Sequence, residues 1–184
     1  ALHEIDSVKA GDGRDSLIKV EKPLVSPRTL DENGNLKLVV SRDWTSGFFP
    51  GELWYMYEFT KDPKWEKQAR AFTTTLEVQK FTKTTHDLGF ILYNSFGNGL
   101  RLTNDQSYKP ILMEAANSLI SRYKPNAKII RSWDHNSDKW QCPVIIDNMM
   151  NLELLFWASR ESGDSTYYDI AVNHANSTMK NHFR

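Results

Sequence analysis

The chain of 184 residues has a single cysteine, Cys142, and no net charge. One thiol excludes an internal disulfide and any metal site built from several thiolates, so we expect Cys142 to be a small buried or loop hydrophobe. The 23 basic and 23 acidic side chains balance, which argues against a charge-driven association with nucleic acid or a membrane surface. This balance leaves room for a local basic pocket that binds an anionic ligand.

Long apolar runs and the familiar short catalytic motifs are also missing. No run reaches the roughly 18 apolar residues of a membrane span. The metal motif HExxH, a glycine-rich phosphate loop, the GxSxG elbow and CxxC do not occur, and His135 and His174 have no partner at a metal-ligand spacing. No leader is recognisable, although a start at Ala1 is compatible with a leader that has been removed.

Three segments are predicted to be helices that are apolar on almost every side: Phe49–Thr60, Asp87–Gly97 and Asp147–Arg160. A helix without a polar face has to be covered all round. Each of these segments is followed by a helix with one apolar stripe, and these are expected from Pro63 to near Phe81, over Thr103–Tyr123, and around Tyr167–Thr178. Repeated pairs of an inner and an outer helix are typical of an α/α toroid.

The sequence therefore predicts an all-α fold, an (α/α)6 toroid or barrel of which about half is present. Residues 1–184 are expected to form a single catalytic domain, the N-terminal portion of a truncated barrel, and residues 1–9 resemble the last turns of a helix. Asn33-Gly34 predicts a hairpin turn between residues 29–31 and 36–40. The connection over residues 125–146 has a length that is typical of functional loops.

Two of the inner helices begin with a carboxylate, Asp87 and Asp147. The inner helices of a toroid run in the same direction, so these acids should meet at the mouth of one cavity. Such a pair can perform general acid–base catalysis, although either aspartate could instead simply cap its helix. Burial among Phe90, Met149 and Met150 would raise the pKa of these carboxyl groups, whereas the helix N-terminus would lower it, and the sequence does not decide between the two.

Further candidates lie at the same end of the predicted toroid. His86 is either a ligand for an anionic substrate group or a surface residue, and Trp44 either stacks on a sugar or packs in the core. Trp133 and Trp140, on the long connection, are weaker candidates for binding a substrate. The other three tryptophans lie in predicted helices and are expected in the core: Trp54, Trp65 and Trp157.

Three stretches carry a resemblance to a known family: residues 41–54 (SRDWTSGFFPGELW), 85–90 (THDLGF) and 145–153 (IIDNMMNLE). In this order they resemble unsaturated glucuronyl hydrolases, glycoside hydrolase family 88. Three motifs in register are far more specific than any one of them. The resemblance implies an (α/α)6 barrel that removes a 4,5-unsaturated uronic acid from the non-reducing end of lyase-generated oligosaccharides of the glycosaminoglycan type.

The resemblance also implies a mechanism and a set of roles. Members of this family hydrate the C4=C5 double bond, and the resulting hemiketal opens and releases the aglycone without a metal or organic cofactor. Asp147 would be the general acid and base, and Asp87 the second essential carboxylate. His86 and Trp44 would line the subsite for the unsaturated sugar, with Asn148 as a pocket neighbour.

Three other functions stay open at this point. The same chemistry could act on pectin fragments, as in unsaturated rhamnogalacturonyl hydrolases; the chain could be an inactive glycan-binding half-barrel; or one carboxylate could attack the anomeric carbon, as in conventional glycosidases. The unsaturated oligosaccharide is the expected partner, and a bacterial cytoplasm or periplasm is the expected location. An open half-barrel should also expose the sides of its inner helices and associate with itself.

Overall fold

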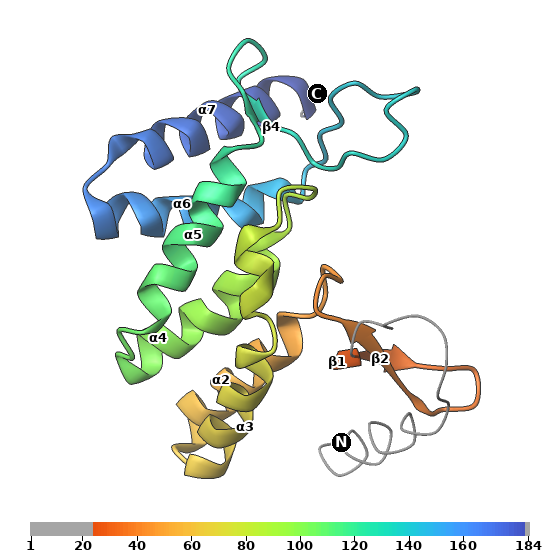
Figure 1. The fold of residues 1–184 in the computed structure, drawn as a ribbon, viewed down its shortest axis with the longest axis vertical. Coiled ribbons are helices and arrows are strands. Elements are labelled where there is room, and N and C mark those ends of the chain that lie inside the picture. The colour runs from red at the N-terminus through yellow and green to blue at the C-terminus, as the bar shows by residue number, and fades with distance from the viewer. Residues whose placement is uncertain (1–23, 183–184) are drawn as a thin grey trace.

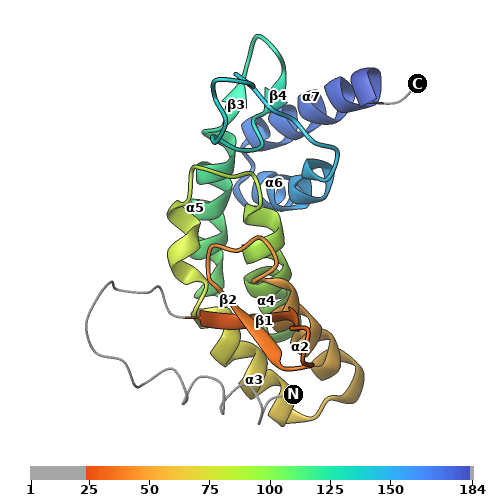
Figure 2. The ribbon, with the colours of Figure 1, turned by 90° about the vertical axis from the view of Figure 1, so that its right-hand side faces the viewer.

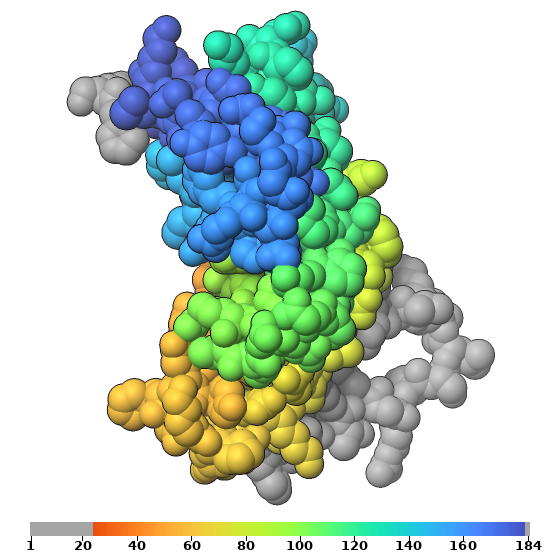
Figure 3. All heavy atoms as spheres, turned by 90° about the vertical axis from the view of Figure 1, so that its left-hand side faces the viewer, coloured from red at the N-terminus to blue at the C-terminus, as the bar shows by residue number. Residues whose placement is uncertain are grey.

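The computed structural model describes residues 24–182 of the chain, so the helical turns predicted for residues 1–9 lie outside the described residues. The described part is mostly helical, and its helices stack as three successive pairs along the long axis of the molecule (Figure 1). Figure 3 shows the same progression on one face, from the first pair through the second to the third. The predicted all-α class and the inner–outer helix pairs are confirmed.

The first pair consists of α2 (Phe48–Thr60) and α3 (Pro63–Thr74). Asp62 caps α3, because its side chain accepts a hydrogen bond from the Lys64 N–H at 3.0 Å. The prediction that this helix continues to near Phe81 is wrong. It ends at Thr74, where threonine hydroxyls bond back to backbone carbonyls, and a 3-10 turn η1 (Glu77–Phe81) follows.

The second pair begins with η2 (Gly89–Gly97), a π-helix that continues directly into α4 (Asn98–Thr103). The prediction that the inner helix ends at Gly97 is wrong, since the left-handed residue that ends it is Asn104, with φ 55°. Gly99 serves packing instead of termination, because a Cβ there would lie 2.6 Å from the ring of Tyr108. The outer helix α5 (Tyr108–Ile120) is shorter than the predicted Thr103–Tyr123, because it starts only at Tyr108 and so keeps Pro110 in its first turn, where the missing N–H costs no intrahelical hydrogen bond.

The third pair consists of α6 (Asn148–Ser162) and α7 (Ser165–His182). Two short hairpins flank the helices. β1 (Leu24–Leu30) pairs with β2 (Leu36–Val40) through the predicted turn, in which Gly34 has φ 81°. β3 (Tyr123–Lys124) pairs with β4 (Ile129–Ile130) within the long connection, at the same end of the stack as α7 (Figure 2).

The core lies between the helix pairs, and one side of the stack is open. Trp54 and Trp157 are buried as predicted, and Trp65 is half-buried against the core. The expectation that each inner helix is covered all round holds for most of η2 but is wrong for α2 and α6. The exposure of these two helices agrees with the other expectation, that an open half-barrel exposes the sides of its inner helices. The exposed apolar side chains of these two helices include Tyr55, Met56, Phe59, Met149, Met150 and Phe156. None of the helices within residues 24–182 is both long and apolar enough to cross a bilayer.

His174 of α7 joins the third pair to β4. Its side chain is fully buried, and its Nδ1 accepts a hydrogen bond from the Ile130 N–H at 3.0 Å. Burial, the largest cause, lowers the pKa of His174 from its ordinary 6.5 to about 4. This histidine is therefore neutral at neutral pH and acts as a hydrogen-bond acceptor for the backbone.

We predict that acid destabilises the fold through this residue. The unfolded chain binds a proton at His174 below pH 6.5, whereas the folded chain does so only near pH 4. The free energy of unfolding should therefore fall by about 3 kcal/mol between these two pH values. Urea titrations from pH 7 to 4 measure this decrease in the free energy of unfolding. The decrease should be largely absent in His174→Gln and unchanged in the exposed control His135→Gln. An equally steep loss in His174→Gln would contradict the assignment.

Candidate active site

The structure brings together Asp87, which precedes η2, and Asp147, the last residue before α6. His86 lies between the two carboxylates. Its Nε2 is 3.1 Å from Asp87 Oδ1 and 3.6 Å from Asp147 Oδ1. His86 is therefore a buried member of this group, with 3% of its side chain exposed, and not the surface residue that the sequence left open. Asp87 is 17% exposed and Asp147 36%, so the group opens to solvent on the side of Asp147.

Helix capping does not account for either carboxylate. Asp147 occupies the N-cap position of α6, yet its side chain makes no capping hydrogen bond. Asp87 lies one residue before the N-cap of η2, and its Oδ2 accepts a hydrogen bond from the hydroxyl of Thr85. Both side chains are thus directed at the shared group with His86 and not at the ends of their own helices.

Burial decides the protonation of Asp147. Desolvation is the largest influence and raises the pKa of this carboxyl group; His86 opposes it, and the charge of Asp87 raises the pKa further. Asp147 Oδ1 is buried and accepts no hydrogen bond from the described residues, so the exposed part of the carboxyl group is its other edge. Of the two forces that the sequence left in competition, burial is the stronger one at this residue.

A close contact between η2 and α6 fixes the two acid-bearing helix starts relative to each other. A Cβ at Gly89 would lie only 2.6 Å from the Asn151 Cα, so only glycine permits this approach. The Phe90 N–H donates to Asn151 Oδ1 at 2.9 Å across the contact. Sequence reasoning missed Asn151 as a site-supporting residue, because a lone asparagine in an apolar helix carries no recognisable spacing.

Asn148 lies next to Asp147 but points into the protein. Its side chain is fully buried, and its Nδ2 donates to the Ile130 carbonyl at 3.4 Å. In this position it forms part of the wall behind the carboxylates. Its direct contact with a substrate stays a prediction.

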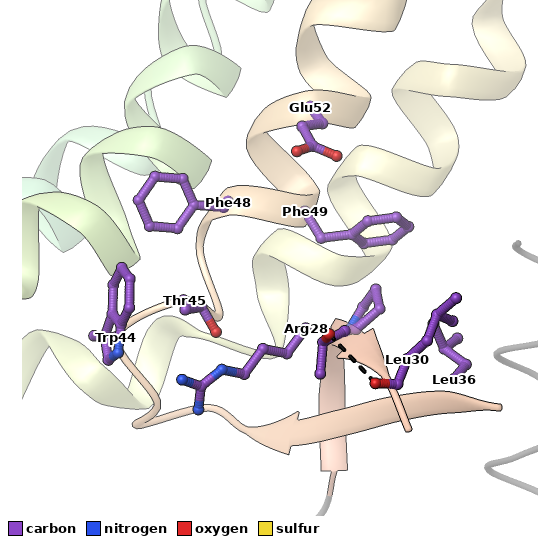
Figure 4. A pocket seen from close by; sticks show the side chains of 10 residues that line it. Arg28, Leu30, Leu36, Trp44, Thr45, Phe48, Phe49 and Glu52 are labelled. Atoms are coloured by element: carbon purple, nitrogen blue, oxygen red, sulfur yellow. Dashed lines mark hydrogen bonds between the residues drawn. The ribbon is translucent and has the colours of Figure 1, made fainter. Parts of the chain in front are cut away.

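Trp44 is partly packed and partly exposed, so it fits neither alternative of the sequence analysis exclusively. Its ring packs against Phe48 and Phe90, with ring centroids 6.0 and 6.1 Å away, and 46% of the residue stays exposed. Together with Arg28 and Glu52 it lines a pocket of about 720 Å³ between the β1–β2 hairpin and the start of α2 (Figure 4). The ring is therefore anchored on one side and available to a ligand on the other.

Trp133 and Trp140 lie together on the long connection. The Trp133 ring stacks on His135, with centroids 5.4 Å apart, and meets the Trp140 ring edge-on at 6.2 Å. The backbone of Trp133 forms an antiparallel bridge with Thr85, so it lies beside the segment that carries His86. Trp140 is half-exposed, and direct contact of either tryptophan with a substrate stays a prediction.

A second pocket of about 410 Å³ lies on the inner face beside the carboxylates, between η2 and α6. Its lining includes Gly89, Phe90, Met149 and Met150, which follow the two aspartates closely in sequence. Phe48 lines both this pocket and the pocket beside Trp44. Neither aspartate lines this pocket itself. Its walls are largely apolar and include aromatic side chains, which suit the faces of a sugar ring.

Within residues 24–182, one group of three acidic or histidine side chains also has the proximity that a metal ion requires. This group is again His86, Asp87 and Asp147, whose ligand-type atoms lie within 4.8 Å of one another. The same distances suit a proton shared among a histidine and two carboxylates. Burial and the charge of Asp87 raise the pKa of Asp147, which favours its protonated form relative to that of an exposed aspartate.

The chain is similar to known proteins over most of its described length, although no protein-family model matches it. An unsaturated glucuronyl hydrolase of Formosa agariphila is 54% identical over 147 residues, which cover 79% of this chain and 37% of that protein. An unsaturated chondroitin disaccharide hydrolase of Streptococcus pneumoniae is 33% identical over 145 residues, covering 77% of this chain and 37% of that protein. The chain thus spans a little over a third of the length of these curated relatives.

Solved structures agree with the sequence comparison. An unsaturated glucuronyl hydrolase specific for heparin is 46% identical with a TM-score of 0.84, over 90% of this chain and 44% of that one. A Streptococcus agalactiae unsaturated glucuronyl hydrolase complexed with dGlcA-GalNAc6S is 26% identical with a TM-score of 0.66, over 86% of this chain and 38% of that one. The chain is therefore related to the unsaturated glucuronyl hydrolases, and the resemblance seen in its three motifs is confirmed.

Proposed function

We propose that this chain supplies the acid-bearing part of a bacterial glycoside hydrolase that releases 4,5-unsaturated uronic acid from lyase-generated oligosaccharides of the glycosaminoglycan type. The names of the relatives support this substrate class. Residues 1–184 are one portion of the catalytic domain, and Asp147 and Asp87 are its catalytic residues. Because the chain spans little more than a third of its relatives, the proposal concerns the whole protein.

One observation carries the proposal: a carboxyl group with a raised pKa faces a second carboxylate across a buried histidine. Protonation of an enol ether at carbon needs an acid that still holds its proton near neutral pH. Burial and the neighbouring negative charge raise the pKa of Asp147 in this direction. No protein side chain has to act as a nucleophile, because the attacking group is water.

The reaction is a hydration of the C4=C5 bond followed by ring opening. Asp147 gives its proton to C4, water adds to C5, and the carboxylate of Asp147 takes up the proton that the water loses. The product carries a hydroxyl group and the ring oxygen on C5, and this hemiketal opens to a ketone. The hemiacetal then left at C1 releases the aglycone with its oxygen, so water is the only reagent consumed.

The remaining candidates bind and orient the sugar in this proposal. Trp44 offers its exposed ring face to the unsaturated ring, and His86 holds the two carboxylates and donates to the substrate or to Asp87. Trp133 and Trp140 form the aromatic rim on the other side. Asn148 keeps the first turn of α6 in place beneath Asp147.

We predict that the protein consumes the ultraviolet absorbance of the C4=C5 bond in unsaturated chondroitin and heparin disaccharides. The assay contains a chelator, so that the decay reports a reaction without a metal ion. An unsaturated rhamnogalacturonan disaccharide and a saturated glucuronide run in parallel. Turnover of the glycosaminoglycan substrates alone supports the proposal. Preference for the rhamnogalacturonan substrate would favour a pectin enzyme, and turnover of the saturated glucuronide would contradict the hydration mechanism.

A binding-only alternative has a distinct signature in the same experiment. Saccharide binding measured by calorimetry, with no loss of absorbance even in a polypeptide of the relatives' length, would identify an inactive glycan-binding protein. We further propose that the chain by itself associates through its open side, where Phe59 is 88% exposed. A bacterial cytoplasm or periplasm is the compartment we propose, because the named relatives come from bacteria.

A further inference from the structure

Ser132 lies between the two segments that carry the carboxylates. Its side chain is fully buried. Its carbonyl accepts a hydrogen bond from the His86 N–H at 3.0 Å, and its Oγ accepts one from the Ile145 N–H at 3.1 Å. Its own N–H donates to the Pro143 carbonyl at 2.8 Å. One residue thus holds the backbone next to Asp87 and the backbone two residues before Asp147.

The residues before Ser132 tie it to the body of the protein. The Ile130 N–H donates to Nδ1 of His174, and the Ile130 carbonyl accepts from Asn148 Nδ2. The Arg131 N–H donates to the Arg122 carbonyl at 3.1 Å. Residues 130–132, which we name the brace, are therefore fixed on α7, on α6 and on β3 at the same time.

We propose that Ser132 is a positioning residue that sets the separation of the two catalytic carboxylates. The inference rests on the proposed function, because it names a residue that acts on that same site. Ser132 does not contact the reacting atoms; it acts through the backbones of His86 and Ile145. Neither the sequence motifs nor helix packing requires a serine here, since Ser132 lies on the irregular connection between β4 and α6.

The contacts explain why a serine is suited to this place. The hydrogen bond from the His86 N–H to the Ser132 carbonyl does not depend on the side chain at position 132. The hydrogen bond from the Ile145 N–H, in contrast, requires a hydroxyl group on the Cβ of that residue. Ile145 has no other hydrogen bond from its N–H in the described structure, and residues 143–147 form no regular element. Loss of the hydroxyl would therefore loosen the backbone at Ile145, two residues before Asp147, while the backbone hydrogen bonds to Pro143 and His86 stay in place.

The test compares Ser132→Ala with Ser132→Thr, which keeps the hydroxyl group, and with the control Ser118→Ala. Ser118 is also fully buried and makes one side-chain hydrogen bond, to the Lys80 carbonyl, on α5. In the whole protein, Ser132→Ala should lower kcat by about 10- to 100-fold with KM within about twofold, because small displacements of reacting groups cost rates of this size. Ser118→Ala should leave both constants close to those of the unmodified protein.

A pH profile separates positioning from a general loss of stability. In Ser132→Ala the basic limb of kcat/KM should move to lower pH, because Asp147 leaves its buried position, and Ser132→Thr should restore it. An unshifted limb with a kcat equal to that of Ser118→Ala would overturn the proposal. So would a Ser132→Thr variant that folds, keeps the Ile145 amide protected and still behaves like Ser132→Ala.

Hydrogen exchange tests the inference without any substrate. Ser132→Ala should abolish the protection of the Ile145 amide and keep that of the His86 amide, whereas Ser118→Ala should keep both. If the protein turns over no unsaturated disaccharide, the proposed function fails, yet this measurement still decides whether Ser132 holds the segment before Asp147. Equal protection of Ile145 in Ser132→Ala and the unmodified protein would overturn the inference by itself.

Discussion

Replacing Asp147 by asparagine should reduce kcat on an unsaturated glycosaminoglycan disaccharide by about 10³- to 10⁴-fold, the upper part of the range for loss of a general acid–base group. Asparagine keeps the shape of the side chain but has no proton to give to C4 and no basic oxygen to take one from water. The loss should appear in kcat and kcat/KM alike, because the side chain acts on the transition state. Initial rates of absorbance loss at the C4=C5 bond measure it.

Lower stability or weaker substrate binding could also reduce the rate, and both can be tested separately. Asp147 makes no capping hydrogen bond, so asparagine should leave α6 and the free energy of unfolding nearly unchanged. Saccharide binding, measured by calorimetry, should persist in Asp147→Asn. The matched control is Asp138→Asn, which makes the same change at an exposed aspartate of the same connection and should keep full activity. A decrease of less than tenfold in Asp147→Asn would rule out its proposed function as the acid.

The helix pairs could be predicted from the sequence because their apolar patterns are long. Asp62 with Pro63, and Gly163 in its left-handed conformation, mark helix ends by local chemistry that a sequence shows directly. The glycines of the second inner helix misled the prediction, since the same residue that ends a helix also permits close packing. Gly99 lies against the ring of Tyr108 on the next helix and the ring of Trp54 on the sequence-distant helix α2, and only the folded structure reveals these contacts.

The meeting of Asp87 and Asp147 could also be predicted, because it follows from the common direction of the inner helices. The environment that gives the pair its chemistry could not. The pKa of Asp147 depends on burial and on the distance to Asp87, and neither is visible in a local motif. Ser132 escaped prediction for a related reason: its carbonyl and its hydroxyl accept hydrogen bonds from backbone N–H groups of segments on either side of it in the sequence.

Asp87→Asn should move the basic limb of the pH–rate profile to lower pH and reduce kcat by about 10²- to 10³-fold, within the range for a residue that supports acid–base catalysis. The charge of Asp87 raises the pKa of Asp147, so removing that charge lowers it. The reaction needs Asp147 in its protonated form. A lower pKa means that this form is lost at a lower pH, which fixes the direction of the shift.

The shift in kcat/KM reports the free enzyme and therefore the same carboxyl pair that the structure describes. Thr85→Val supplies the control, because it removes the hydroxyl that donates to Asp87 Oδ2 but keeps the charge. This variant should retain most of its activity and the position of its basic limb. A limb that stays in place or moves to higher pH in Asp87→Asn would contradict the assignment of Asp147 as the proton donor whose pKa is raised by the charge of Asp87.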